Sequence, residues 1–204
     1  MPERWLSEAD RSRFIDFPAE IPAADVITFF TLQETDLQFI RLHYGAAGRL
    51  GVALQLSALR YFGSVPDDLM KAPFPVVGFL ARQLEVAPEA LSAYGQRSQT
   101  RTEHLRESER HLGFHKAAVT EKNELARWLR ERALEHDRPL LLLQLLCERL
   151  HAQKIVRPGL TLLERAVTTA RQQAQTTTWE LLAPLLSAPD REKLAQQEGS
   201  CDKT

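Results

Sequence analysis

The sequence predicts an all-α protein made of two small helical modules, each with a helix-turn-helix-like pair. Apolar residues recur at intervals of three and four along most of the 204 residues, which is the repeat of one helix face. No stretch keeps the two-residue alternation of a strand for long. Hydrophobic residues make up 44% of the chain, which is enough to bury a core.

Short helices separated by loops open the first module. We expect one helix over residues 7–14, a loop that contains the prolines at 18 and 22, and a second helix over 23–32. A capping box formed by Thr31 and Glu34 then predicts the start of a third helix.

A glycine turn over residues 45–48 is expected to lead into a helix over 49–63. Its apolar face consists of Leu50, Leu54, Ala58 and Phe62. Helix, short glycine-containing turn and helix is the layout of a unit whose second helix can lie in a DNA groove. Most helical hairpins bind no DNA, so a purely structural interpretation of this pair stays open.

Prolines at 66, 73, 75 and 88 punctuate two more short helices. The prolines at 73 and 75 stand where a helix can begin. We place the domain boundary in the loop near Tyr94 and Gly95. The first helical DNA-binding module is therefore expected to span residues 1–95. The apolar stripe of the helix after Pro75 is expected to be Val76, Val77, Leu80 and Leu84.

Longer helices characterise the second module, expected over residues 96–186. The helix that starts near residue 98 keeps only Leu105 and Leu112 as large apolar residues, which predicts an exposed surface. An amphipathic helix over 120–137 and a strongly apolar helix from Pro139 follow. The remaining residues, 187–204, show no helical pattern, and we expect either a disordered tail or the start of a missing downstream region.

The helix from Thr161 completes a second helix-turn-helix-like pair. Arginine, threonine and glutamine on its polar face are donors and acceptors that reach phosphates and base edges. Any solvated helix shows similar residues, so this interpretation competes with a structural one. The apolar face holds Leu163, Ala166, Val167, Ala170 and Ala174. The polar face holds Thr161, Arg165, Thr168, Thr169, Arg171, Gln172 and Gln175.

Charge is distributed unevenly although the net charge is only −1. Residues 1–95 hold 8 Lys and Arg against 12 Asp and Glu, whereas residues 96–186 hold 15 against 11. The second module is the cationic one. DNA contacts in the acidic first module would have to be local, because a broad basic field is missing there.

The stretch "YGQRSQTRTEHLRESERHLGFH", residues 94–115, carries arginines at intervals of four or five residues. Glutamates one turn away explain Arg106 and Arg110 as internal ion pairs. Arg97 and Arg101 precede those acids near the helix start, where a cation opposes the helix dipole, so an external anion is a reason for them. Phosphate backbone is the expected anion.

We expect neither a metal nor a cofactor. His104, His111 and His115 lack a cysteine or carboxylate set that would complete a metal site. The chain has no Gly-rich phosphate loop, no G-x-S-x-G elbow and no HExxH motif. Isolated carboxylates in loops and at helix ends are explained by capping. The sequence therefore predicts no enzyme activity for this chain.

Two cysteines form neither a disulfide framework nor a paired zinc motif, which favours a reducing compartment. The N-terminus lacks the apolar core of a signal peptide, and the longest apolar run is far shorter than the roughly 20 residues of a bilayer span. We expect a soluble, cytoplasmic protein without membrane contact.

Several blocks together resemble the start of transposases of the replicative class II transposons, the Tn-three family. They are the run over residues 4–63, "VVGFLARQLEV", the arginine-rich stretch above and "GLTLLERAVTTARQQA", in that order. The resemblance covers roughly residues 3–186. It implies helical DNA-binding modules that recognise the terminal inverted repeats of the transposon. It also implies that the catalytic part, with an acidic metal-binding triad in an RNase H-like core, lies far downstream of this chain.

By this resemblance we expect a sequence-specific DNA-binding portion of a transposase, bacterial and nucleoid-associated, whose partner is double-stranded DNA. The expected phosphate contacts are Arg97, Arg101, Thr102, His104 and Arg106. The expected groove contacts are Thr161, Arg165, Thr168 and Arg171. Weaker candidates in the first module are Arg41, Arg49 and Arg60.

A rival hypothesis is a helical protein-interaction module. A truncated transposase of this kind would regulate transposition by pairing with itself or with full-length transposase. Salt dependence separates the two hypotheses, because phosphate binding weakens steeply as salt rises and an apolar protein interface does not. A stable remnant without activity is a third interpretation.

Overall fold

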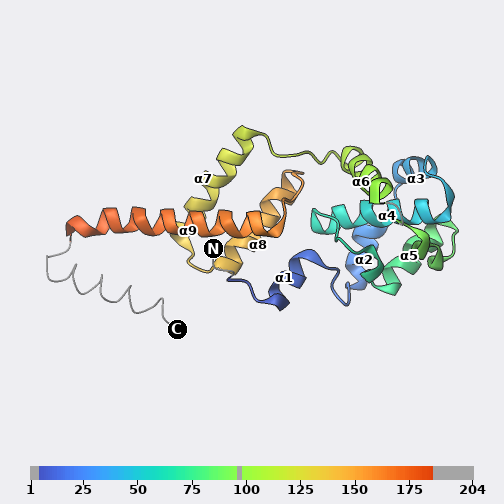
Figure 1. Ribbon diagram of the computed structural model, residues 1–204, viewed down its shortest axis with the longest axis horizontal. Coiled ribbons are helices and arrows are strands. Elements are labelled where there is room, and N and C mark those ends of the chain that lie inside the picture. The colour runs from blue at the N-terminus through green and yellow to red at the C-terminus, as the bar shows by residue number, and fades with distance from the viewer. Residues whose placement is uncertain (1–4, 96–97, 186–204) are drawn as a thin grey trace.

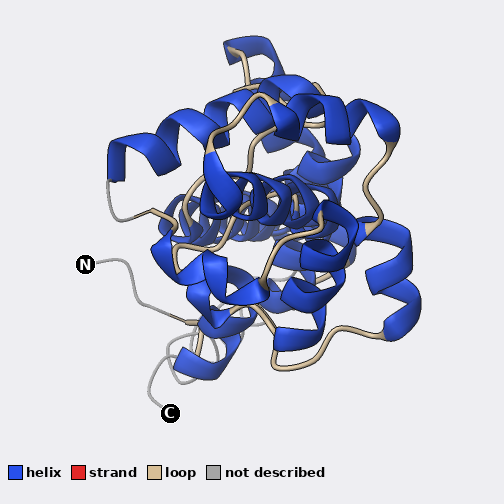
Figure 2. Cartoon of the chain, turned by 90° about the vertical axis from the view of Figure 1, so that its right-hand side faces the viewer, coloured by secondary structure: helices blue, strands red, loops and turns tan. Residues whose placement is uncertain are grey.

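The structure, a computed structural model, describes residues 5–95 and 98–185. Every regular element in these ranges is a helix, and extended pairing is limited to one isolated bridge between His115 and Ile155 (Figures 1 and 2). The all-α prediction is confirmed. The α-helices are α1 (Glu8–Ile15), α2 (Ala23–Phe30), α3 (Glu34–Arg41), α4 (Gly45–Phe62), α5 (Phe74–Leu84), α6 (Ser98–Leu112), α7 (Val119–Glu135), α8 (Pro139–Ala152) and α9 (Leu160–Leu182). Short 3-10 helices are η1 (Leu69–Lys71), η2 (Pro88–Ala93) and η3 (Ala183–Leu185).

Helix α4 is the centre of the first hydrophobic cluster. Residues 50–59 are all buried, because α2, α3, α5, α6 and η2 pack around them. Leu50, Leu54 and Ala58 are buried as predicted, but so are the residues on the other sides of the helix. A helix that is apolar all round belongs inside a protein. α4 is therefore a central core helix and not an exposed recognition helix.

Two local predictions in this region are wrong. No separate turn occupies residues 45–48: Gly45, at φ 72°, changes the chain direction in one residue, and α4 begins there. The capping box of α3 is formed by Gln33 and Asp36. The Thr31 hydroxyl instead donates to the Ile27 carbonyl of α2 at 2.6 Å, since a threonine at a helix end can also bond backwards.

The second hydrophobic cluster is formed by α7, α8 and α9. The N-terminal halves of α7 and α9 lie beside each other, and so do their C-terminal halves, so the two helices run in the same direction. Leu142, Leu143 and Leu146 of α8 are buried beneath them. The apolar run after Pro139 thus becomes the buried helix that the sequence predicts.

The first helix of the chain packs on the last. Trp5, Leu6 and Phe14 contribute to the second cluster. Arg11 donates to both carboxylate oxygens of Glu164 at 2.8 Å. α6, in turn, packs on α4 of the first cluster. Segments from both sides of residue 95 thus pack on each cluster. That residues 1–95 and 96–186 form separate modules stays a prediction.

Candidate nucleic-acid interface

The outer face of α9 carries a polar stripe that has no carboxylate before Glu180. Its residues are spaced by three or four, so they share one side of the helix. The only acidic residue between Leu160 and Trp179 is Glu164, which is buried and paired with Arg11. All five stripe residues are exposed: Thr161, Arg165, Thr169, Gln172 and Thr176.

Two predicted groove contacts on α9 are placed differently. The Thr168 hydroxyl accepts a hydrogen bond from Nε1 of Trp5 at 3.2 Å and donates to the Glu164 carbonyl. Arg171 donates to Asp137 at 3.1 and 2.8 Å. Thr168 and Arg171 therefore face other parts of the protein. The face of α9 that is open to solvent lies further around the helix than predicted, toward Thr169 and Thr176.

The predicted phosphate contacts on α6 divide into three groups. Arg97 lies outside the described residues. Thr102 and Arg106 are exposed on the outer side of the helix. Arg101 is half-buried, and its carbonyl accepts a hydrogen bond from Gln55 of α4 at 3.1 Å. Arg110, which was not among the expected phosphate contacts, is also exposed and lies one turn beyond Arg106. The four-residue spacing between the two arginines could have indicated this from the sequence, because residues four apart share one helix face.

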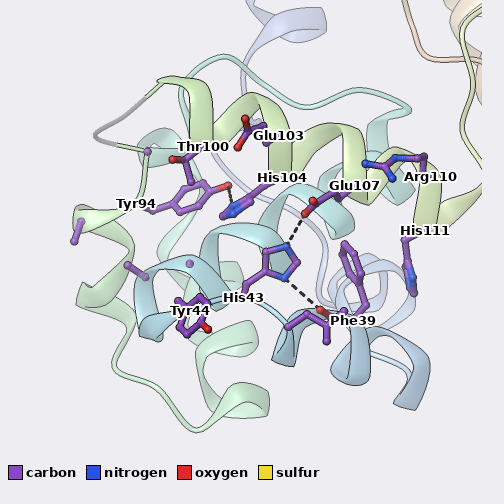
Figure 3. Close-up of a pocket in the computed structure, with 15 residues that line it drawn as sticks. Phe39, His43, Tyr44, Tyr94, Thr100, Glu103, His104, Glu107, Arg110 and His111 are labelled. Carbon is purple, nitrogen blue, oxygen red and sulfur yellow. Dashed lines mark hydrogen bonds and ion pairs between the residues drawn. The ribbon is translucent and has the colours of Figure 1, made fainter.

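His104 lies on the inner side of α6, against the first cluster. The Tyr94 hydroxyl and Nδ1 of His104 form a hydrogen bond at 3.0 Å, and the two rings stack (Figure 3). The ring of His43 meets His104 edge-on, with centroids 4.6 Å apart. Burial, followed by the nearby His43, lowers the pKa of His104, and burial raises the pKa of Tyr94. His104 thus packs against the first cluster, on the side of α6 away from the exposed Arg106.

His43 connects α6 to the end of α3. Its Nε2 lies 3.0 Å from a carboxylate oxygen of Glu107, and its Nδ1 lies 3.2 Å from the Phe39 carbonyl oxygen, both within hydrogen-bond distance (Figure 3). The His43 ring therefore joins the end of α3 to α6.

A buried carboxylate makes the second connection. Asp36 has no exposed surface and accepts hydrogen bonds from Arg60 at 2.6 Å and from His111 at 3.0 Å. The His111 ring also stacks on Phe39. Burial alone would raise the pKa of Asp36, but hydrogen bonds from Arg60, the Gln33 amide and His111 lower it below its ordinary value. His104 and His111 of the arginine-rich stretch therefore attach α6 to the first cluster.

The weaker candidates in the first module have separate surroundings. Arg60 is committed to Asp36. Arg41 is exposed and lies 4.0 Å from Glu34. Arg49 is exposed, and its Nε donates to the His43 carbonyl at 3.4 Å. Arg41 at the end of α3 and Arg49 near the start of α4 are therefore the two that stay exposed.

An open cavity of about 990 Å³ lies between α6 and the α3–α4 turn (Figure 3). Tyr44, one of its lining residues, is 98% exposed. Glu103 and Glu107 line the α6 side together with Arg110. Two carboxylates disfavour a phosphate inside this cavity.

Residues 5–95 and 98–185 contain no group of three His, Cys, Asp or Glu side chains placed to hold a metal ion. None of the helices described there is long and apolar enough to cross a bilayer.

A family model described as "Domain of unknown function (DUF4158)" matches residues 5–170. The chain belongs to the DUF4158 family. It is 36% identical over 196 residues to the transposase for transposon Tn3926 of Escherichia coli. It is also 32% identical to the transposase for transposon Tn501 of Pseudomonas aeruginosa and 33% identical to that for transposon gamma-delta of Escherichia coli (strain K12).

The three matches cover 95%, 95% and 96% of this chain but only 20% of each relative. This DUF4158 chain thus spans about a fifth of the length of these transposases and corresponds to their N-terminal region. The predicted resemblance to the Tn-three family is confirmed, and a transposase-related role follows.

Proposed function

We propose that this chain is the DNA-recognition portion of a transposase and that it binds the terminal inverted repeats of a transposon. The observation that carries the proposal is the α9 stripe. From Leu160 to Trp179 the helix exposes Thr, Gln and Arg side chains, and Glu164, the one carboxylate in that stretch, is paired with Arg11. A helix face of this kind can approach a major groove without repelling the phosphates on either side.

Helix α6 supplies the second half of the proposal. Arg106 and Arg110 are exposed, whereas His104 and His111 on the inner side bond to Tyr94 and to Asp36 of α3. A fixed helix that presents arginines outward suits contact with a phosphate backbone, which positions a protein on DNA without reading sequence. Thr161 and Arg165 are proposed to read bases, and Arg106 to contact phosphate.

The test is fluorescence anisotropy of the chain with a labelled terminal inverted repeat and with a scrambled duplex, at two salt concentrations. We expect tighter binding to the repeat, weakened as salt rises. Arg165→Ala should reduce discrimination between the duplexes by about 1–3 kcal/mol. Arg106→Ala should weaken both alike and reduce the salt slope by about one.

Arg82→Ala is the matched control. Arg82 is exposed on α5 of the first cluster, away from α9, so the substitution removes the same charge without touching either surface. Equal effects of Arg82→Ala and Arg165→Ala would contradict the assignment of α9. Absence of binding to both duplexes would overturn the proposal for this chain.

A further inference from the structure

An apolar groove lies between the N-terminal halves of α7 and α9, within the second hydrophobic cluster. It measures about 610 Å³. Leu129, Leu146, Leu150 and Ile155 line it and are at most 4% exposed, so the groove reaches the hydrophobic core. Sites for small organic molecules are commonly of this size and are lined mainly by apolar side chains. The groove therefore has the dimensions and the lining of a small-molecule site.

Short side chains on the two helices keep the groove open to solvent. Ala126 of α7 and Ala166 of α9 form parts of its walls, and both residues are exposed. Leu162, one turn before Ala166 on the same face of α9, is 58% exposed and also lines the groove. A larger side chain at either alanine would occupy the space, which gives a direct way to close the groove.

Every charged residue that lines the groove is a cation: Lys116, Lys122 and Arg157. Among the described residues, no carboxylate forms an ion pair with any of them. Arg157 donates to the Phe14 carbonyl, and Lys116 interacts electrostatically with Glu109 of α6. The Lys122 ammonium has no acceptor in the part of the chain that the structure describes. These cations favour an anion at the mouth of the groove.

We propose that the groove binds an unbranched aliphatic carboxylate, whose hydrocarbon tail lies on the apolar floor and whose carboxylate meets Lys122 and Arg157. A neutral apolar molecule would leave the cations without a counter-charge, and an inorganic anion would leave the apolar walls in water. A partner helix, about 10–12 Å across, would fill a groove of this volume with about one turn. A narrow hydrocarbon chain with an anionic head fits both the shape and the charge.

The site adjoins the surface proposed for DNA. Thr169 lines the groove and also belongs to the polar stripe of α9. A bound carboxylate would place a negative charge beside the phosphates of a duplex on that stripe. Occupancy of the groove and DNA contact by α9 should therefore oppose each other. This coupling, unlike the site itself, rests on the proposed function.

Isothermal titration calorimetry of the 204-residue chain with octanoate, decanoate and dodecanoate tests the site. We expect one molecule bound per chain. Each lengthening by two methylenes should tighten binding by about 4- to 16-fold, because a buried methylene contributes about a factor of four. Dodecanol, which has the same tail without the charge, should bind at least ~10-fold more weakly than dodecanoate.

Two variants locate the binding in the groove. The ring in Ala166→Phe would occupy the space and should weaken dodecanoate binding at least ~10-fold, whereas Ala24→Phe, on the exposed side of α2, should not. Lys122→Ala should weaken dodecanoate at least ~3-fold and leave dodecanol unchanged, and Arg82→Ala is its control. Far-UV circular dichroism verifies that all four variants are folded.

Several results would overturn the site. They are the absence of saturable dodecanoate binding, an affinity that does not rise with chain length, and equal affinities for dodecanoate and dodecanol. Equal losses in Ala166→Phe and Ala24→Phe, or in Lys122→Ala and Arg82→Ala, would do the same. The measurements contain no DNA, so their failure would leave the proposed function unaffected.

Discussion

Removal of the Asp36 carboxylate should destabilise the protein far more than removal of an exposed aspartate with a similar partner. The Asp36 side chain is 1% exposed and joins three elements. Its oxygens accept hydrogen bonds from Gln33 at the start of α3, from Arg60 on α4 and from His111 on α6. Asp36→Ala therefore removes a helix cap and the counter-charge of a half-buried guanidinium in one step.

The expected magnitude follows from burial. Removing one partner of a buried ion pair costs about 3–5 kcal/mol, because the other charge is left without compensation. The Arg60 side chain is only 23% exposed, so water can replace the carboxylate only in part. Asp137, paired with Arg171, is 79% exposed, and an exposed pair contributes about 0–1 kcal/mol. We expect Asp36→Ala to exceed Asp137→Ala by at least ~2 kcal/mol.

Urea unfolding followed by circular dichroism at pH 7 measures the free energy of unfolding of both variants. The pKa of Asp36 is lowered in the folded protein, so its stabilising contribution is present above its ordinary pKa and is lost as the pH falls through the folded value. Equal losses in Asp36→Ala and Asp137→Ala would refute the claim that the buried carboxylate stabilises the packing of α6 on α4.

Two further predictions concern Tyr94 and the residues packed against it. A Cβ atom at Gly51 would lie 2.3 Å from the Tyr94 ring. Gly51→Ala should therefore lower the free energy of unfolding by about 1–3 kcal/mol. Gly78→Ala on α5, where no atom lies within 4 Å, should be neutral or stabilising, and a loss as large as that of Gly51→Ala would contradict this. The folded pKa of His104 is lowered by burial and by His43, so the free energy of unfolding should fall as the pH drops from 7 to 5. His104→Asn should reduce that fall in urea titrations at both pH values, and an unchanged fall would exclude His104 as its source.

The sequence predicts a helix and its burial well where the residues of that segment alone determine both. The apolar run after Pro139 must be buried wherever it lies, and the proline marks its first turn. The short helices between prolines follow from the same local rules. Such predictions need no knowledge of which segments meet.

The orientation of helix faces depended on distant segments and could not be predicted. Thr168 turns inward because Trp5, 163 residues away, donates to its hydroxyl. Arg171 is paired with Asp137, which lies 34 residues earlier in the sequence. His111 meets Asp36 from 75 residues away. A polar face read from periodicity alone cannot separate side chains that bind solvent from those that hold another helix.

Because α1 packs with α9, the chain crosses between the two hydrophobic clusters twice. It leaves the second cluster after Phe14, enters the first at Phe17, and returns to the second at Ala117. A body tethered at two points can rotate only about the line through them, whereas one linker would allow rotation in every direction. Gly63 packs against His151 and further limits that rotation. If Arg106 and Arg165 touch one duplex, the distance between their contacts along the DNA is set by the protein, and a repeat with a different spacing would be bound through one of them alone.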